Sequence, residues 1–142
     1  MAFGLAFRQS VALLLFNATA IANVADNAAS SPITSVFAAL HTADPTSGNQ
    51  TTSEATYTSY ARVGVTRAGG GWSSTAGVVT NVAAITFPSA TGGSNTISHV
   101  SLGTLTSSTG VVFVAGAVTA SLAVSTGIQP QFAISGLSIT VA

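Results

Sequence analysis

Most of the chain follows a two-residue hydrophobic period, and this feature constrains the fold more than any other. From Ile33 onward, short runs rich in Val, Ile, Thr and Phe alternate with clusters of Gly, Pro, Asn and Ser. β-branched and aromatic residues favour strands, whereas Gly, Pro and Asn favour turns. About eight short strands at this spacing predict a mainly β fold, either an antiparallel β-sandwich or a jelly-roll-like barrel. The expected strands span residues 35–42, 61–67, 77–87, 96–105, 111–119, 121–125, 131–134 and 137–141.

A helical period marks the N-terminal region. Apolar residues recur at i, i+3, i+4 and i+7 over residues 8–25, which predicts one helix with Ser10 as its N-cap. Leu13 and Phe16 extend the apolar surface beyond one face, so we expect this helix to be buried on several sides and to reach an interface. The expected organisation is a single domain over residues 1–142, with an N-terminal arm and helix over 1–30 and a β-sandwich over 33–142.

The same N-terminal stretch has two other interpretations. Its start also fits a secretory signal with a cleavage site at Ala18–Ala20, but we expect residue 1 to be tied down by packing instead. The apolar run Val11–Val24 is shorter than the roughly 20 residues needed to span a bilayer, and Asn17 and Asn23 interrupt it. We therefore expect no membrane partner.

Charge is scarce throughout the chain. Charged residues make up 4% of the sequence, against roughly 25% in an ordinary soluble domain, and the formal net charge is zero. Near-zero net charge promotes association, so a homo-oligomer is expected. The three cationic residues are too few to neutralise the phosphates that nucleic-acid binding requires. The absence of cysteine excludes disulfides and thiolate metal sites.

The few charges gather in a polar loop, His41–Arg62, "HTADPTSGNQTTSEATYTSYAR". Asp44 and Glu54 are the best candidates for the paired carboxylates of a glycoside hydrolase, which lie about 5–10 Å apart. We favour the simpler interpretation, that both are solvated loop residues, and expect no enzyme. We predict instead that the loop is a contact surface that binds a partner by shape and hydrogen bonds.

Other residues of interest are histidines, serines and the single tryptophan. His41, His99 and the many serines do not form a nucleophile-elbow motif, so we expect hydrogen-bonded sheet histidines and neither a metal nor a cofactor. Trp72 follows "AGGG", which predicts a turn that folds the indole back onto the sandwich. An exposed Trp72 would be an interface anchor.

The order of the motifs adds a family resemblance. The segments are "SVFAALHTADPTSGN", "TSYARVGVTR", "AITFPSATG", "ISHVSLGTLTSSTGVVFVAGAVTAS" and "IQPQFAISGLSITVA". Over residues 10–142 the chain resembles a family of small tailed-bacteriophage structural proteins, whose members are labelled tail-fibre-like or capsid decoration (cement) proteins.

The resemblance implies a virion component made in the host cytoplasm. The expected function is that of a trimeric decoration protein on the capsid surface, which binds the major capsid protein and stabilises the shell. The alternative is a tail or tail-fibre component involved in host attachment. The candidate interface residues are Leu13, Phe16, Asp44, Glu54, Tyr57, Tyr60, Arg62 and Trp72.

Overall fold

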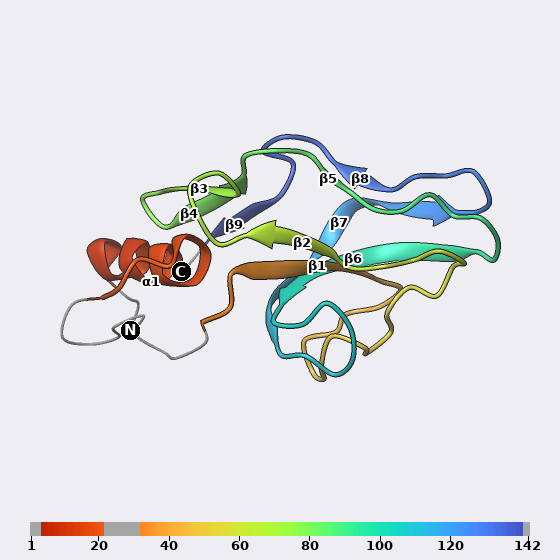
Figure 1. Cartoon of the computed structure of the whole chain (residues 1–142), viewed down its shortest axis with the longest axis horizontal. Coiled ribbons are helices and arrows are strands. Elements are labelled where there is room, and N and C mark those ends of the chain that lie inside the picture. Colours follow the sequence, from red (N-terminus) through yellow and green to blue (C-terminus); the bar gives the residue numbers. More distant parts are fainter. Residues whose placement is uncertain (1–3, 22–31, 141–142) are drawn as a thin grey trace. The chain divides into compact units, whose positions relative to one another are not determined.

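The computed structural model describes residues 4–21 and 32–140 (Figure 1). One helix and nine strands form in this part of the chain. The expected class, a mainly antiparallel β-sandwich-like fold with one N-terminal helix, is confirmed. No helix among the described residues is long and apolar enough to cross a membrane. The elements are α1 (Leu5–Asn17), β1 (Ser35–His41), β2 (Val63–Thr66), β3 (Trp72–Thr75), β4 (Val78–Asn81), β5 (Ile85–Thr86), β6 (Asn95–Gly103), β7 (Val112–Val124), β8 (Gln131–Phe132) and β9 (Ser138–Thr140).

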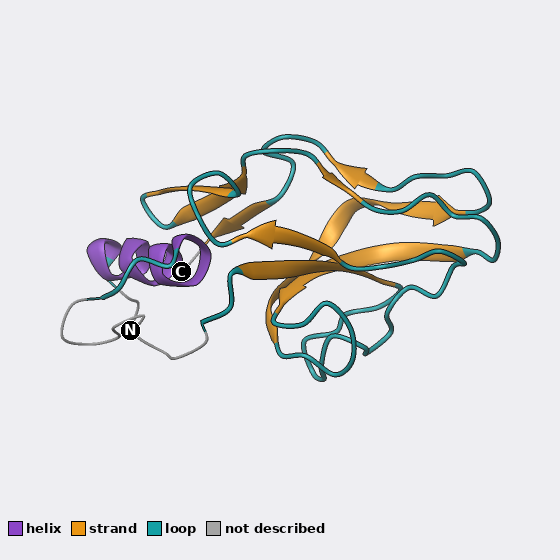
Figure 2. Ribbon diagram, viewed as in Figure 1, coloured by secondary structure: helices purple, strands orange, loops and turns teal. Residues whose placement is uncertain are grey.

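The strands form three sheets, with the orders β2-β1-β6-β7, β3-β4-β9 and β5-β8 (Figure 2). The chain also separates into two compact units. The first comprises Met1–Ser35, Thr66–Ile85 and Phe132–Ala142, and the second Val36–Val65 and Thr86–Gln131. Each unit is therefore assembled from segments that are distant in sequence. The single domain expected from the sequence stays a prediction.

Three strand assignments differ from those expected. The segment 77–87 divides into β4 and β5, and the two strands expected over 111–125 form one strand, β7. Strand β3 was not expected, because "WSST" follows a glycine-rich turn. It pairs with β4 through a two-residue loop in which Ala76 and Gly77 have φ of 53° and 81°. Two successive positive φ angles are typical of a tight β-hairpin turn.

The helix prediction was wrong at both ends. Helix α1 begins at Leu5 and ends at Asn17, where Ala18 takes a left-handed conformation with φ of 54°. Ser10 lies inside the helix, and its hydroxyl donates to the Ala6 carbonyl instead of capping. Residue 1 and residues 22–25 of the expected helix lie outside the described residues. The apolar period continues past Asn17, but the Thr19 N–H bonds back to the Leu13 carbonyl (3.1 Å) and the Asn17 amide donates to the Trp72 carbonyl (3.2 Å) where the helix ends.

The core of the first unit forms where α1 meets the β3–β4 hairpin. Trp72 is completely buried, and its ring contacts Phe16 edge to face at a centroid distance of 5.1 Å. Gln9 adds polar links, because its amide donates to the Ser74 carbonyl (3.1 Å) and accepts from the Gly77 N–H (2.6 Å). The expectation that the tryptophan packs inward is confirmed.

Arg67 ties the end of the helix to the rest of this unit. Its guanidinium donates to the carbonyls of Leu15 (2.6 Å), Leu14 (2.6 Å) and Ile33 (2.7 Å). Carbonyls in the last turn of a helix lack intrahelical partners, and a planar guanidinium presents several donors at fixed angles. One side chain therefore satisfies acceptors from two separate chain segments.

We predict that Arg67→Met lowers the free energy of unfolding by about 3 kcal/mol, because three partly buried carbonyls lose the charged donor that a buried arginine supplies. Urea denaturation of the full chain measures the change. Thr75→Met, at an exposed position of the same unit, is the matched control and should leave stability nearly unchanged. Equal stability of the two variants would show that Arg67 does not hold the helix end.

Candidate functional site

The His41–Arg62 loop is anchored from within by an ion pair. Arg62 donates from Nε to Glu54 Oε1 (2.6 Å) and from Nη2 to Glu54 Oε2 (2.7 Å). The Arg62 side chain is 2% exposed and that of Glu54 is 15% exposed. Bidentate, charge-assisted bonds of this kind are among the strongest in proteins. The bond to Glu54 raises the pKa of Arg62.

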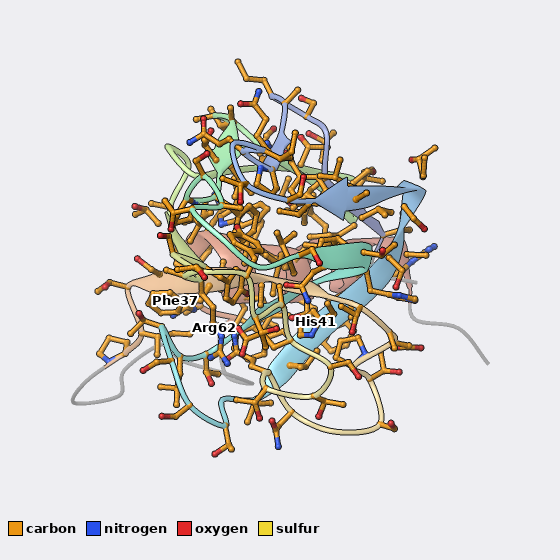
Figure 3. The ribbon with its side chains drawn as sticks, turned by 90° about the vertical axis from the view of Figure 1, so that its right-hand side faces the viewer. Phe37, His41 and Arg62 are labelled. Carbon is orange, nitrogen blue, oxygen red and sulfur yellow. The ribbon has the colours of Figure 1, made fainter. Side chains whose placement is uncertain are left out.

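Tyr60 completes this group, which we call the Arg62 cluster (Glu54, Tyr60 and Arg62). The Tyr60 hydroxyl donates to Glu54 Oε1 (2.9 Å) and accepts from the Leu40 N–H on β1 (3.1 Å). Burial raises the pKa of Tyr60, so the phenol stays protonated and keeps its donor. Figure 3 shows His41 of β1 and Arg62 on the side of the sheet that faces the loops.

A second loop is joined to the first through the same arginine. Arg62 also donates to the carbonyls of Leu105 (2.9 Å) and Ser108 (2.8 Å), in the turn after β6. Gln50 reinforces the connection, because its side-chain oxygen accepts from the Leu105 N–H and its backbone N–H donates to the Gly110 carbonyl, both at 2.9 Å. The His41–Arg62 loop and the turn after β6 are therefore held together, and we call the two together the loop layer.

Gln50 is a residue that sequence reasoning missed. It is completely buried, although glutamine is normally exposed. A Cβ atom on Gly103 or Gly110 would collide with its side chain, so both glycines are needed for the close approach. No sequence signal distinguishes Gln50 from the neighbouring polar residues, because its partners come from a distant hairpin.

His41 and Ser101 form a hydrogen-bonded pair with no access for a substrate. His41 Nδ1 lies 2.9 Å from the Thr52 carbonyl, and Nε2 lies 2.7 Å from Ser101 Oγ. A carbonyl only accepts, so this network assigns the proton to Nδ1, and the Ser101 hydroxyl donates to Nε2. His41 and Ser101 are 0% and 1% exposed. The pair therefore acts as a polar link between β1, β6 and the loop.

The two loop carboxylates have different surroundings. Asp44 is exposed, and its carboxylate accepts the Thr46 N–H (2.9 Å), which lowers the pKa of Asp44. Both Glu54 oxygens are engaged in the Arg62 cluster. Across residues 4–21 and 32–140, no group of three or more His, Cys, Asp and Glu side chains could hold a metal ion. Both carboxylates thus serve the conformation of the loop.

The candidate interface residues occupy different environments. Asp44 is exposed, whereas Leu13, Glu54 and Tyr60 are half-buried and Phe16, Tyr57, Arg62 and Trp72 are buried. The Tyr57 ring contacts Tyr60, and its hydroxyl donates to the Pro88 carbonyl (3.0 Å). The buried side chains present almost no surface in this fold and act through internal packing. Their interface role stays a prediction.

We predict that Glu54→Gln lowers the free energy of unfolding by about 3 kcal/mol, because it leaves the buried Arg62 charge without its counterion. Asp44→Asn is the matched control: the exposed amide oxygen can still accept the Thr46 N–H. Denaturant unfolding of both variants tests this prediction. A loss for Glu54→Gln no greater than that for Asp44→Asn would contradict it.

We also predict acid sensitivity from His41, whose pKa is lowered from 6.5 by burial. The unfolded chain then binds the proton more readily, so this stabilisation is complete above pH 6.5 and declines as the pH falls below that value. The steepest contribution from one proton is about 1.4 kcal/mol per pH unit. Urea unfolding of the native chain and of His41→Gln on both sides of pH 6.5 should show a weaker pH dependence of stability in the variant, and an equal dependence in the two proteins would contradict the prediction.

Comparison with known proteins gives one match that covers most of the chain. Residues 15–140 match the family model described as "Podophage GP4 fiber I protein gp80". No curated protein matches the chain. The matched range includes all nine strands of the described residues, so the relationship extends into both compact units. The expected resemblance to small tailed-phage structural proteins is confirmed, and the chain belongs to the podophage GP4 fiber I protein gp80 family of phage structural proteins.

Proposed function

We propose that this phage structural protein is a subunit of a tail fibre that acts by binding and carries out no chemistry. The observation that carries the proposal is the family match over residues 15–140, because the family is described as a fiber protein. The assignment favours the alternative of the sequence analysis over capsid decoration.

The geometry of the loop layer supports a binding role. Buried hydrogen bonds of the Arg62 cluster and of Gln50 hold the two loops in place. Recognition surfaces are commonly loops that a rigid scaffold positions. The outer side of these loops exposes mainly hydroxyl groups. They belong to Thr42, Thr46, Ser47, Thr51, Ser53, Thr106, Ser107, Ser108 and Thr109. Such a surface suits hydrogen bonding to a neighbouring virion protein or to a host-surface molecule.

Capsid decoration is the second candidate, and the exposed apolar residues favour it. Val111 and Ile134 are 62% and 66% exposed in a chain with zero net charge. Permanent interfaces are large and apolar, so each of these residues, one in each compact unit, fits a position that is covered by a neighbouring protein. A trimer on the major capsid protein would stabilise the shell, because it binds only the assembled form.

Localisation on the particle separates the two candidates. We expect immunogold labelling or cryo-electron microscopy of purified virions to find the protein at the tail fibres. Regular occupancy over the shell would instead establish decoration, and absence from purified virions would overturn both.

Particles that lack the protein provide a functional test. We expect them to lose attachment to host cells while their capsids keep the heat resistance of complete particles. Normal attachment with heat-sensitive capsids would overturn the fibre assignment, because a decoration protein contributes its binding free energy to the shell.

A further inference from the structure

Strand β7 forms an open edge of the four-stranded sheet. It is last in the order β2-β1-β6-β7, and its 13 residues, "VFVAGAVTASLAV", include no charge and no proline (Figure 1). In the described part of the chain, no backbone hydrogen bond links its outer side to another segment. Proteins normally protect such an edge with lysine, proline or a covering loop, because unpaired backbone groups recruit further strands.

Hydrogen bonds on β1 establish which backbone groups face which way. Leu40 donates its N–H to the Tyr60 hydroxyl and accepts the Ala55 N–H at its carbonyl, so its backbone points away from β6. Successive residues of a strand direct their backbone groups to opposite sides. Ala39 therefore bonds to its partner on β6, Ser101.

The same alternation continues from β6 to β7. Val100, next to Ser101, directs its backbone toward β7 and pairs with Gly116. Gly116 therefore points inward, whereas its neighbours Ala115 and Ala117 point their N–H and C=O groups to the open side. Register shifts at Ile97/His99 and Leu102/Gly103 bound this regular stretch.

Gly116 supports the approach of another backbone at this point. It is exposed, and a Cβ atom built on it would meet nothing within 4 Å. Its φ is also not among the positive values found at other glycines. No neighbouring atom of the described residues requires glycine here, and strand glycines mark either a bulge, such as the register shift that begins after Ala117, or the close approach of another backbone.

We propose that β7 pairs with β7 of a second copy of this chain, antiparallel about a two-fold axis at Gly116. Ala115 of each copy would exchange both backbone hydrogen bonds with Ala117 of the other. This register uses the residues whose groups point outward, and it places only small side chains near the axis. The formal net charge of the chain is zero, so two copies do not repel each other electrostatically.

Two exposed apolar residues flank the regular stretch of the edge. Val111 and Leu122 are 62% and 40% exposed, and each lies beyond one of the two register shifts. The proposed hydrogen-bonded pairing is therefore limited to the stretch around Ala115–Ala117. The inference goes beyond the proposed function and holds for a fibre subunit or a decoration protein alike. A trimer would have to join such copies through a different surface.

Cysteine cross-linking tests the register directly, because the native chain has no cysteine. At the axis Gly116 would form a pair without mutual hydrogen bonds, with Cα atoms about 4.5 Å apart, which is within disulfide range. We expect the Gly116→Cys full chain to form a covalent dimer on mild oxidation. Thr126→Cys, at an exposed turn, is the control and should stay uncrosslinked.

Proline substitution tests the backbone bonds. Ala115→Pro and Ala117→Pro each remove an outward N–H, which an edge strand tolerates, and should abolish the dimer in analytical ultracentrifugation. Thr126→Pro is the control: Gly127 has φ of 88° and Ile128 donates to Ser125, a turn that favours proline at Thr126.

A dimeric native chain that Thr126→Pro retains and Ala115→Pro loses, together with the Gly116→Cys cross-link, supports the proposal. A native chain that stays monomeric, or an oligomer without the cross-link, overturns it. If the proline variants fail to fold by circular dichroism, the Gly116→Cys result decides alone.

Discussion

The buried ion pair between Arg62 and Glu54 is the interaction on which the second unit depends. Two loops and the backbone of β1 converge on it, and each hydrogen bond has a partner from a different chain segment. A buried charge is costly when it is left unpaired, so the loop conformation and the pair require each other. The polar loop is consequently a rigid part of the structure.

The same principle explains how the protein uses its few charges. Arg67 holds the end of α1, as Arg62 holds the loops, and both arginines are buried. Arginines usually lie on the surface, where they favour solubility, but here both form hydrogen bonds inside the fold. The exposed side chains that result are mostly hydroxyl-bearing or apolar, and a surface with so few charges offers little electrostatic resistance to permanent assembly.

Part of this arrangement could be predicted from local sequence. The strand regions around β1, β6 and β7 follow from β-branched runs between turn residues, and inward packing of Trp72 follows from its place after a glycine turn. The end of α1 could not be predicted, because the apolar period continues past it and the contacts made there include a bond from Asn17 to the distant residue Trp72. Gln50 was missed for a similar reason, because its environment is created by the hairpin at Gly103–Gly110.

The sequence by itself determined the mainly β class, the low charge and the membership of a phage structural family, because periodicity, composition and motif order are local or additive properties. Only the tertiary structure decided that the charged loop is clamped from within, that His41 and Ser101 are closed to substrate, and that β7 ends the sheet. These are properties of pairing between distant segments. Which backbone groups remain unpaired is fixed only when the strand order is formed.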